Sequence, residues 1–515
     1  MALPIKILDC TLRDGGYYTN WDFNKDLVNT YIHAFNQLPV EYLEIGYRSN
    51  PMNGYLGEYF YCPIYVMKGL KNISNKKLVI ILDEKDVRPE NIDALLKPCI
   101  GLIDMVRIAI DPKNFKRALV LAEAIKKMGF EVGFNVMYMS KWPGQREFLS
   151  QIKEVKGIAD YFYMVDSYGG IYPNDVKNMY DLVRTQTDVK IGFHGHNNLE
   201  LALINTLTAI ECGVDIVDAT ITGMGRGAGN LKTELLLTAL NAKGQMELDF
   251  NALSHVVDGF SKLQATYEWG TNLPYMVSGA NSLPQKDVMD WVSKRFYSLN
   301  SIIRALHNQK DGVEDNQRFP IFNSAKKIKK AVIIGGGPTA FDHSEAIKLF
   351  IQDQKDICLI HASAKNAFPY STLAVPQYYC LAGNEGQRLS TVFNEFEEFD
   401  GICILPPFPR KMGTYVPDKV SLSTYELGAV DYTNMVKDTH TSLAIQTAIE
   451  LGIDEIFVTG YDGYGESNVG TKEQELFIEN DLLFCDAQKY GLNISSLTPT
   501  RYKNLVAGSI YDKLN

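Results

Sequence analysis

Several patterns that would assign a chain of 515 residues to a class at once are missing from this sequence. Its eight cysteines include no Cys-x-x-Cys pair, so we expect neither a thiolate zinc site nor a dithiol redox motif. No apolar run reaches the ~18 residues that cross a bilayer, so we expect no membrane partner. Lysine and arginine residues are not clustered into a basic stripe along the sequence, and the formal net charge is -10. Both features argue against nucleic acid as the main partner.

The first residues also lack the pattern of a secretory signal peptide. Isolated cysteines inside apolar runs behave as small hydrophobic residues and suit a reducing compartment. We therefore expect a cytoplasmic protein. The 46% hydrophobic and 22% charged residues are typical of a soluble globular chain, and we further expect a homo-oligomer.

The first half of the chain alternates short β-branched runs with amphipathic segments. Repeated strand–helix units predict a parallel sheet, and eight of them predict closure into a TIM (β/α)8 barrel, an α/β fold. The expected strands are residues 5–10, 42–45, 78–82, 105–110, 131–137, 161–165, 190–193 and 215–219.

The second half repeats the strand–helix pattern with fewer units. We place the barrel in residues 1–247, a helical extension in 248–308 and a polar linker in 309–329. Residues 330–515 then predict an open, doubly wound, Rossmann-like α/β domain. Its clearest expected strands are residues 331–334, 357–361, 401–405 and 455–459.

Two motifs lie where a barrel has its active site, at the carboxyl ends of strands. The first, TLRDG at 11–15, follows the first expected strand and directs Asp14 into the pocket. The second is HGH, at the end of the seventh strand. Residues i and i+2 of an extended chain share a face, so His194 and His196 reach one point. We predict that Asp14, His194 and His196 hold a metal ion.

Two imidazoles and one carboxylate leave coordination positions open, as a catalytic metal ion requires. Such mixed ligands suit manganese, magnesium, iron or zinc, and they also serve ferrous oxygenases, an alternative that these residues leave open. A glycine-rich segment, 223–230, follows the eighth expected strand. Its backbone N–H groups can bind an anion or a keto acid, and Asn230 can offer a carbonyl oxygen to the metal.

Together these residues resemble a known family over the chain from about residue 4 to 300. The matching segments are DCTLRDG (9–15), EIG (44–46), VDS (165–167), HGHN (194–197) and 223–230. They resemble the DRE-TIM metallolyases, and within them most closely the 4-hydroxy-2-oxovalerate aldolases. The resemblance implies a divalent-metal-dependent aldolase or lyase that cleaves or forms the bond between a pyruvate-type enolate and an aldehyde. Its partners would be a small 2-keto acid and an aldehyde.

The resemblance also implies roles for single residues. Arg13 would stabilise the enolate, Ser167 would lie near the substrate carboxylate, and Glu44 would order the pocket. The metal would be Mn²⁺ foremost, with Mg²⁺, Zn²⁺ or Co²⁺ as substitutes. The assigned residues are, for the metal, Asp14, His194, His196 and Asn230; for catalysis, Arg13, Tyr17, Glu44 and Ser167; and for the substrate, Arg226, Gly227 and Gly229.

Two positions depart from the family pattern. Tyr17 stands where the aldolases resembled carry a histidine that acts as the base. A tyrosine with an unperturbed pKa of ~10 is a poor base at neutral pH, so either the base lies elsewhere or the substrate differs. Arg226 stands where those aldolases usually have a small residue, and we hypothesise that it contacts an anionic group on the acceptor.

Other functions stay open. One is an acyl-CoA-dependent condensing enzyme of the same superfamily, although the sequence after Asp14 is Gly-Gly-Tyr rather than the Gly-Glu-Gln of the synthases resembled. Another is a non-catalytic binding protein on a decayed barrel, which Tyr17 motivates. A lysine Schiff-base aldolase is also compatible with a barrel, and Lys85 is the best-placed lysine for it.

A weaker motif opens the second domain. Gly335, Gly337 and Ala340 follow an expected strand and form a short version of a dinucleotide-binding fingerprint, which makes both glycines candidate cofactor-binding residues. The next expected strand ends at His361 and offers no acidic residue for a ribose. The alternative is a tight turn that packs a helix on the sheet, and the ligand stays unknown.

Overall fold

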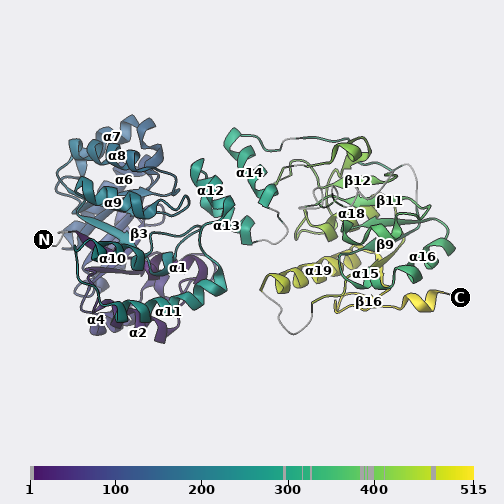
Figure 1. The fold of residues 1–515 in the computed structure, drawn as a ribbon, viewed down its shortest axis with the longest axis horizontal. Helices are drawn as coiled ribbons and strands as arrows, with labels where there is room; N and C mark the ends of the chain where they lie inside the picture. The colour runs from purple at the N-terminus through teal and green to yellow at the C-terminus, as the bar shows by residue number, and fades with distance from the viewer. Residues whose placement is uncertain are drawn as a thin grey trace. The chain divides into compact units, whose positions relative to one another are not determined.

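Figure 1 shows the fold as a computed structural model, which describes residues 5–293, 297, 299–315, 317–324, 328–382, 388, 391, 399–410, 412, 413, 415–464 and 471–514. The chain divides into two compact units, Met1–Met289 and Asp290–Asn515. The division falls inside residues 248–308, the expected helical extension, and the expected linker lies partly outside the described residues. Within the described part of the chain, every helix is too short or too polar to span a bilayer.

The first unit is built around eight parallel strands that close into a barrel in chain order, with β8 hydrogen-bonded to β1. The predicted TIM barrel is confirmed, and each expected strand overlaps the observed one. The strands are β1 (Lys6–Asp9), β2 (Tyr42–Tyr47), β3 (Lys77–Asp83), β4 (Met105–Ile110), β5 (Glu131–Val136), β6 (Tyr161–Asp166), β7 (Lys190–Gly195) and β8 (Ile216–Ala219).

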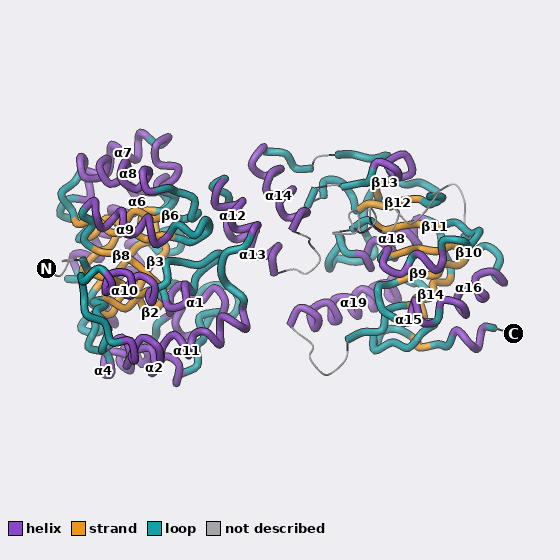
Figure 2. Tube along the Cα trace, in the orientation of Figure 1, coloured by secondary structure: helices purple, strands orange, loops and turns teal. Residues whose placement is uncertain are grey.

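Helices surround the barrel strands and connect them (Figure 2). Helix α9 ends at Gly213, which adopts a left-handed φ of 97°. Long helix α11 packs against α2 and buries Phe260 in the barrel's outer core. The helices of the first unit are α1 (Thr11–Thr19), α2 (Lys25–Phe35), α3 (Glu58–Tyr61), α4 (Ile64–Ile73), α5 (Ile92–Leu96), α6 (Phe115–Lys127), α7 (Arg146–Gln151), α8 (Pro173–Gln186), α9 (Ala202–Cys212), α10 (Thr233–Ala242), α11 (Phe250–Tyr267) and α12 (Leu273–Ala280). Helix α13 (Gln285–Ser293) crosses the division between the units, and α14 (Leu299–Asp311) belongs to the second unit.

The inside of the barrel combines an apolar cluster with buried charges. Leu8, Tyr42 and Tyr161 belong to the apolar cluster. Arg107 and Asp218 are buried charged residues on β4 and β8. A charged side chain inside a barrel is stable only with a partner. We therefore expect these residues to form ion pairs or hydrogen bonds with one another or with other buried polar residues.

The second unit contains a second parallel sheet, as predicted, in the order β13-β12-β11-β10-β9-β14-β15-β16. Alternate residues of β9 point to opposite faces: Ile333 packs in a cluster with Leu443 of α18, and Val332 packs in another with Ile347 of α16. Helices therefore cover both faces. The elements are β9 (Lys330–Ile334), α15 (Thr339–Asp342), α16 (Ser344–Asp353), β10 (Ile357–His361), β11 (Gln377–Cys380), β12 (Ile402–Leu405), β13 (Thr424–Glu426), α18 (His440–Glu450), β14 (Glu455–Thr459), α19 (Thr471–Tyr490), β15 (Asn493–Ser496) and β16 (Val506–Ala507).

Candidate active site

The carboxyl ends of the barrel strands enclose a cavity of about 430 Å³. Asp14 comes from α1 just after β1, Ser167 follows β6, and His194 and His196 lie at the end of β7 and just beyond it. All four line the cavity. Barrel closure thus brings together residues that the sequence keeps far apart. The lining also includes Arg13, Tyr17, Tyr47 and Arg226.

A buried carboxylate fixes the turn that carries Asp14. Asp9, the last residue of β1, accepts hydrogen bonds from the Thr11 N–H (2.9 Å), the Tyr31 hydroxyl (2.7 Å) and the Thr233 hydroxyl (2.6 Å). Burial raises the pKa of Asp9 to about 6, although these hydrogen bonds oppose the rise. Since α1 begins at Thr11, these bonds set the direction in which the helix presents Asp14.

Asp14 and the two histidines converge on the cavity. Asp14 Oδ2 lies 3.9 Å from His194 Nε2, and the two imidazole centroids are 4.9 Å apart. Burial alone would raise the pKa of Asp14, but Arg13 and the histidines lower it below its usual value, so the carboxyl group is ionised. Burial and the neighbouring His194 lower the pKa of His196 to about 3, so this imidazole is neutral. A carboxylate and a neutral imidazole are the forms that bind a metal ion.

Both histidines bind the protein through Nδ1 and present Nε2 to the cavity. His196 Nδ1 lies 2.7 Å from the carbonyl oxygen of Asp166, which only accepts, so Nδ1 carries the hydrogen and Nε2 the lone pair. His194 Nδ1 lies 2.8 Å from the Asp218 carboxylate, which selects the same tautomer. Burial opposes the charge on Asp218, but Arg107 holds the pKa of that carboxyl below its usual value. Metal-binding histidines are held in this way.

Asn230, in the glycine-rich segment, lies beside Asp14. Its Nδ2 donates to Asp14 Oδ2 at 2.6 Å, while its buried Oδ1 accepts no hydrogen bond among the described residues. One carboxylate and two imidazole nitrogens form a donor set that fits a divalent metal ion. Asn230 could add its amide oxygen only after the amide turned over, because Nδ2 is the atom that faces Asp14.

A second group of donors lies nearby. Ligand atoms of Cys10, His194 and Asp218 lie within 4.8 Å of one another. Burial raises the pKa of Cys10 well above its usual value, so it is a thiol, and its Sγ donates to the Ala219 carbonyl at 3.6 Å. Asp218 already binds Arg107 and His194. This group therefore fits a metal ion less well than Asp14 with the two Nε2 atoms.

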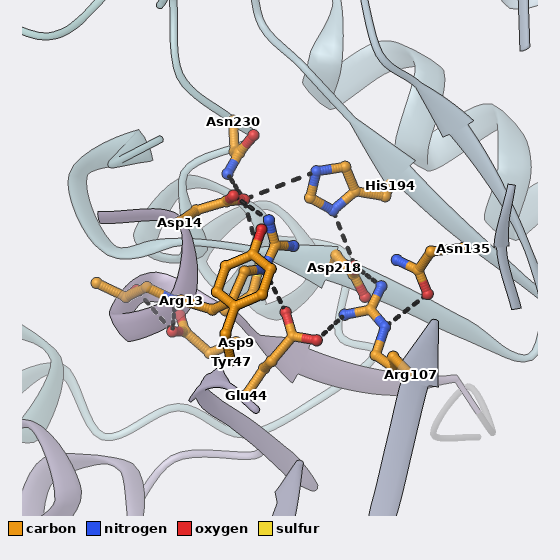
Figure 3. A network of polar contacts seen from close by, with 12 residues as sticks. Asp9, Arg13, Asp14, Glu44, Tyr47, Arg107, Asn135, His194, Asp218 and Asn230 are labelled. Carbon is orange, nitrogen blue, oxygen red and sulfur yellow. Dashed lines mark hydrogen bonds and ion pairs between the residues drawn. The ribbon is translucent and has the colours of Figure 1, made fainter. Parts of the chain in front are cut away.

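A chain of buried charges links Arg13 to His194 (Figure 3). Glu44 Oε2 accepts from Arg13 Nε at 2.7 Å, and its Oε1 lies 3.3 Å from Arg107 Nη1. Arg107 binds Asp218, which holds His194. Burial works against the charge on Arg13, yet neighbouring carboxylates raise its pKa well above the usual value. Glu44 does not line the cavity, so it positions Arg13 rather than contacting a ligand.

Tyr17 and Arg226 contact each other at the cavity wall. The guanidinium carbon of Arg226 lies 4.3 Å from the centroid of the Tyr17 ring. The Tyr17 hydroxyl lies 3.2 Å from the hydroxyl of Tyr47, a buried residue. Lys85 also lines the cavity, but it pairs with Asp83 at 2.8 Å. An exposed, paired lysine lacks the apolar surroundings that make a Schiff-base lysine reactive.

The remaining predicted residues divide between cavity and loop. Ser167 lines the cavity, and its Oγ accepts from the Tyr138 N–H at 2.9 Å, which leaves its hydroxyl hydrogen for a ligand. Gly227 and Gly229 do not line the cavity and have φ values of 65° and 78°. A Cβ on Gly229 would lie 2.1 Å from a backbone oxygen across the loop. These glycines therefore shape the loop that carries Asn230.

The sequence motifs did not reveal the residues that support the histidines. Arg107, Asp218 and Asn135 are buried and bind one another or His194. One feature of the sequence could have indicated them, which is a charged residue within an otherwise apolar strand. Arg107 stands in MVRIAI and Asp218 in IVDA.

Known proteins share both the sequence and the fold of the first unit. A model of the HMGL-like family matches residues 106–259. The 4-hydroxy-2-oxovalerate aldolase of Thermomicrobium roseum is 33% identical over 265 residues, which covers 47% of this chain and 68% of that enzyme. The chain belongs to the HMGL-like family. An oxaloacetate decarboxylase of Mycobacterium tuberculosis is 29% identical over 249 residues, 47% of this chain and 71% of that one.

A solved structure matches this HMGL-like chain more closely in sequence. It is the N-terminal domain of a Bacteroides vulgatus protein described as an aldolase, with 61% identity and a TM-score of 0.56. The match covers 58% of this chain and 100% of that one. The predicted resemblance to the DRE-TIM metallolyases is thereby confirmed, and the relatives indicate a lyase, an aldolase or a related enzyme of that superfamily.

Proposed function

We propose that the first unit is a divalent-metal-dependent aldolase that cleaves or forms the bond between a pyruvate-type enolate and an aldehyde. The observation that carries this proposal is the convergence of Asp14 and the Nε2 atoms of His194 and His196 on one cavity. The names of the relatives, aldolases and a decarboxylase of a keto acid, support the same class of reaction.

Asp14, His194, His196 and Asn230 are the residues that would hold the ion, Mn²⁺ foremost. When bound, a divalent ion supplies a Lewis acid at the 2-keto oxygen. Asp14 is the only one of the four donor side chains that can carry a negative charge, and the lowered pKa of His196 keeps that imidazole neutral. The site therefore keeps room for a second anionic group, and a keto acid carboxylate provides it.

Cleavage to an aldehyde and pyruvate requires two proton transfers, from the 4-hydroxyl group and to C3, and stabilisation of one developing charge. A base takes the proton of the 4-hydroxyl group, the C3–C4 bond breaks, and its electron pair forms the enolate as the aldehyde leaves. Arg13, which Glu44 holds in place, stabilises the negative charge on the enolate oxygen. Protonation at C3 then gives pyruvate. Ser167 donates its hydroxyl hydrogen to the substrate carboxylate.

We assign Tyr17 to the proton of the 4-hydroxyl group by its position, although a free tyrosine is a poor base at neutral pH. It lines the cavity, and its hydroxyl is hydrogen-bonded to that of Tyr47, which fixes its position. A positioned side chain of this kind contributes roughly 10²- to 10⁴-fold to a rate. Arg226, on the ring of Tyr17, lies beside the same wall and suits an anionic group of the aldehyde.

Exchange of the methyl protons of pyruvate in deuterated water tests the proposal before the aldehyde is known. The full chain with Mn²⁺ should incorporate deuterium, as measured by mass spectrometry, because enolate formation and reprotonation are the same steps. A chelator should stop the exchange and Mn²⁺ should restore it. Asp14→Asn should abolish it, whereas Asp258→Asn, an exposed carboxylate on α11, should not change it.

Other outcomes would support the alternatives. Exchange that survives the chelator and allows trapping by borohydride would indicate a lysine Schiff base instead. Exchange of an acyl-CoA alone would indicate a condensing enzyme, and no exchange at all would indicate a binding protein. Oxaloacetate should be tested as a second substrate, because loss of CO₂ from it leaves the same enolate. One relative is named an oxaloacetate decarboxylase.

A further inference from the structure

The second unit contains a cavity of about 630 Å³ at the carboxyl ends of β9, β10 and β14. It is lined by the turn Gly335–Pro338 after β9, by Ser363 and Lys365 after β10, and by the loop that follows β14. Strand β9 has β10 on one side and β14 on the other, and the chain order reverses there. Doubly wound sheets bind their ligands at this switch point.

The three positions of the turn are occupied by glycine for different physical reasons. A Cβ on Gly335 would lie 2.5 Å from the Gly460 carbonyl oxygen, and one on Gly337 would lie 2.6 Å from Asp462 Oδ2. Both positions need glycine to pack against the loop after β14. A Cβ on Gly336 would meet nothing nearer than Ser363 Oγ at 3.6 Å, and its φ is not left-handed. Neither packing nor strain requires glycine there, so a ligand's close approach explains it.

Acidic and basic residues line different parts of this cavity. Asp462 accepts from the Thr339 N–H at 3.1 Å and from the Thr339 hydroxyl, so the protein's own carboxylate occupies the start of α15. A phosphate at that position would meet this negative charge. Lys365 is exposed on the other wall, and no described residue forms an ion pair with it. Arg388 also lines the cavity and donates to Ser363 Oγ at 3.2 Å.

The rest of the lining suits a ligand larger than a free anion. Glu479, Asn480 and Tyr502 also line the cavity, and Asn480 Nδ2 donates to the Tyr502 hydroxyl at 3.3 Å. Carboxylates in a cavity of this kind accept hydrogen bonds from ribose hydroxyls. A basic wall beside an exposed backbone turn, opposite carboxylates, matches a phosphate group joined to a sugar.

We propose that this cavity binds a nucleotide, with its phosphates at Gly336, Ser363 and Lys365 and its ribose hydroxyls toward Asp462 and Glu479. The glycine that contacts the ligand is therefore Gly336, and Gly335 and Gly337 only build the turn. The inference concerns the second unit alone and does not depend on the aldolase proposal.

Equilibrium dialysis of the full chain against ATP, GTP, CTP, UTP and their monophosphates tests the proposal. At least one nucleotide should bind with a Kd below ~1 mM, and pyrophosphate should bind more weakly. Lys365→Gln and Gly336→Val should each weaken binding about tenfold or more, because one loses a charge-assisted bond and the other fills the space beside the turn. Lys355→Gln, an exposed lysine outside the cavity, is the matched control and should bind as the parent does.

Three outcomes would overturn the proposal. They are no binding of any nucleotide, binding of pyrophosphate as tight as that of the nucleotides, and equal affinity in Lys365→Gln and the parent. Lys365 is exposed, so its substitution leaves the fold intact. If Gly336→Val fails to fold, hydrogen exchange of the parent provides the second measurement, and nucleotide must slow exchange in residues 335–338. Pyruvate proton exchange should be the same in Lys355→Gln and the parent.

Discussion

At the scale of single residues, the candidate site depends on groups that do not line the cavity, namely two carboxylate side chains and one backbone carbonyl. Asp218 fixes the ring of His194, the Asp166 carbonyl fixes that of His196, and Glu44 holds Arg13. Each of these groups fixes the tautomer or the orientation of a residue at the cavity and does not itself line the cavity. The cavity residues are therefore held in place by hydrogen bonds from buried groups of the barrel.

Tyr17→Phe tests the assignment of the proton-transfer group. Loss of the hydroxyl should lower kcat for cleavage of a 4-hydroxy-2-keto acid about 100-fold, with little change in Mn²⁺ affinity. Tyr47→Phe removes only the partner of that hydroxyl, 3.2 Å away, and should have a much smaller effect. Pyruvate release measured in steady state gives both values. Full kcat in Tyr17→Phe would mean that another group takes the proton.

Arg226→Ala tests the hypothesis that this residue contacts an anionic group on the acceptor. The guanidinium lies on the Tyr17 ring and lines the cavity. Its loss should raise KM for the hydroxy acid more than it lowers kcat, because binding to a remote group is lost in the ground state and the transition state alike. Arg226→Lys should recover part of the loss. Equal kcat/KM in the Arg226→Ala variant and the parent would refute the contact.

Motif spacing predicted that Asp14, His194 and His196 meet at the carboxyl ends of barrel strands, and all three line the cavity there; their binding of a metal ion stays a prediction. The buried residues that orient the histidines could not be predicted from motif spacing. Arg107 and Asp218 are 111 positions apart and meet only when the barrel closes. Which atoms of a histidine face the cavity also depends on partners that the local sequence does not contain.

At the scale of elements, the loop between β8 and α10 is shaped by its glycines. Gly223, Gly227 and Gly229 all have a left-handed φ, of 69°, 65° and 78°. This loop brings Asn230 to 2.6 Å from Asp14 and carries Arg226 to the cavity. A strand ladder or a helix could not place both residues, so the irregular backbone itself is a functional feature.

Gly229→Ala tests how tightly this loop is built, with Gly244→Ala as its matched control. Both glycines have a left-handed φ, but a Cβ at 229 would lie 2.1 Å from a backbone oxygen, and a Cβ at 244 would meet nothing within 4 Å. The control should lose about 1 kcal/mol of unfolding free energy from strain alone. Gly229→Ala should lose several times more, by denaturant titration, and should bind Mn²⁺ more weakly. Equal losses would contradict the close packing.

At the scale of the whole molecule, the chain contains two units whose cores are separate. The barrel has its own closed sheet and core, and the second sheet has a core on each face. The matching Bacteroides vulgatus structure is an isolated N-terminal domain, and the match covers all of it. The first unit therefore has what a domain needs to fold alone.

A chain that ends at residue 298 tests this independence. We expect it to be soluble, to unfold in one cooperative transition and to exchange pyruvate protons at nearly the rate of the full chain, because every cavity residue precedes the cut. Mass spectrometry in deuterated water and thermal unfolding measure both properties. An aggregated or inactive product would show that the barrel requires the second unit.

The sequence predicted the barrel better than the second sheet. Six of the eight barrel strands have six or seven residues, and each barrel strand was expected within a few residues of its observed bounds. In the second unit, β13, β15 and β16 have the sequences TYE, NISS and VA. Strands of two to four residues carry too little periodicity to be recognised, and they form because a neighbouring strand offers its edge.

The most direct test of the account is a titration with Mn²⁺, followed by electron paramagnetic resonance of the free ion. The parent chain and Cys10→Ala should each bind one ion in the barrel, because the buried thiol is not a ligand. Asp14→Asn and His196→Gln should lose that ion. Binding that survives in Asp14→Asn and disappears in Cys10→Ala would contradict the account and assign the metal to Cys10, His194 and Asp218 instead.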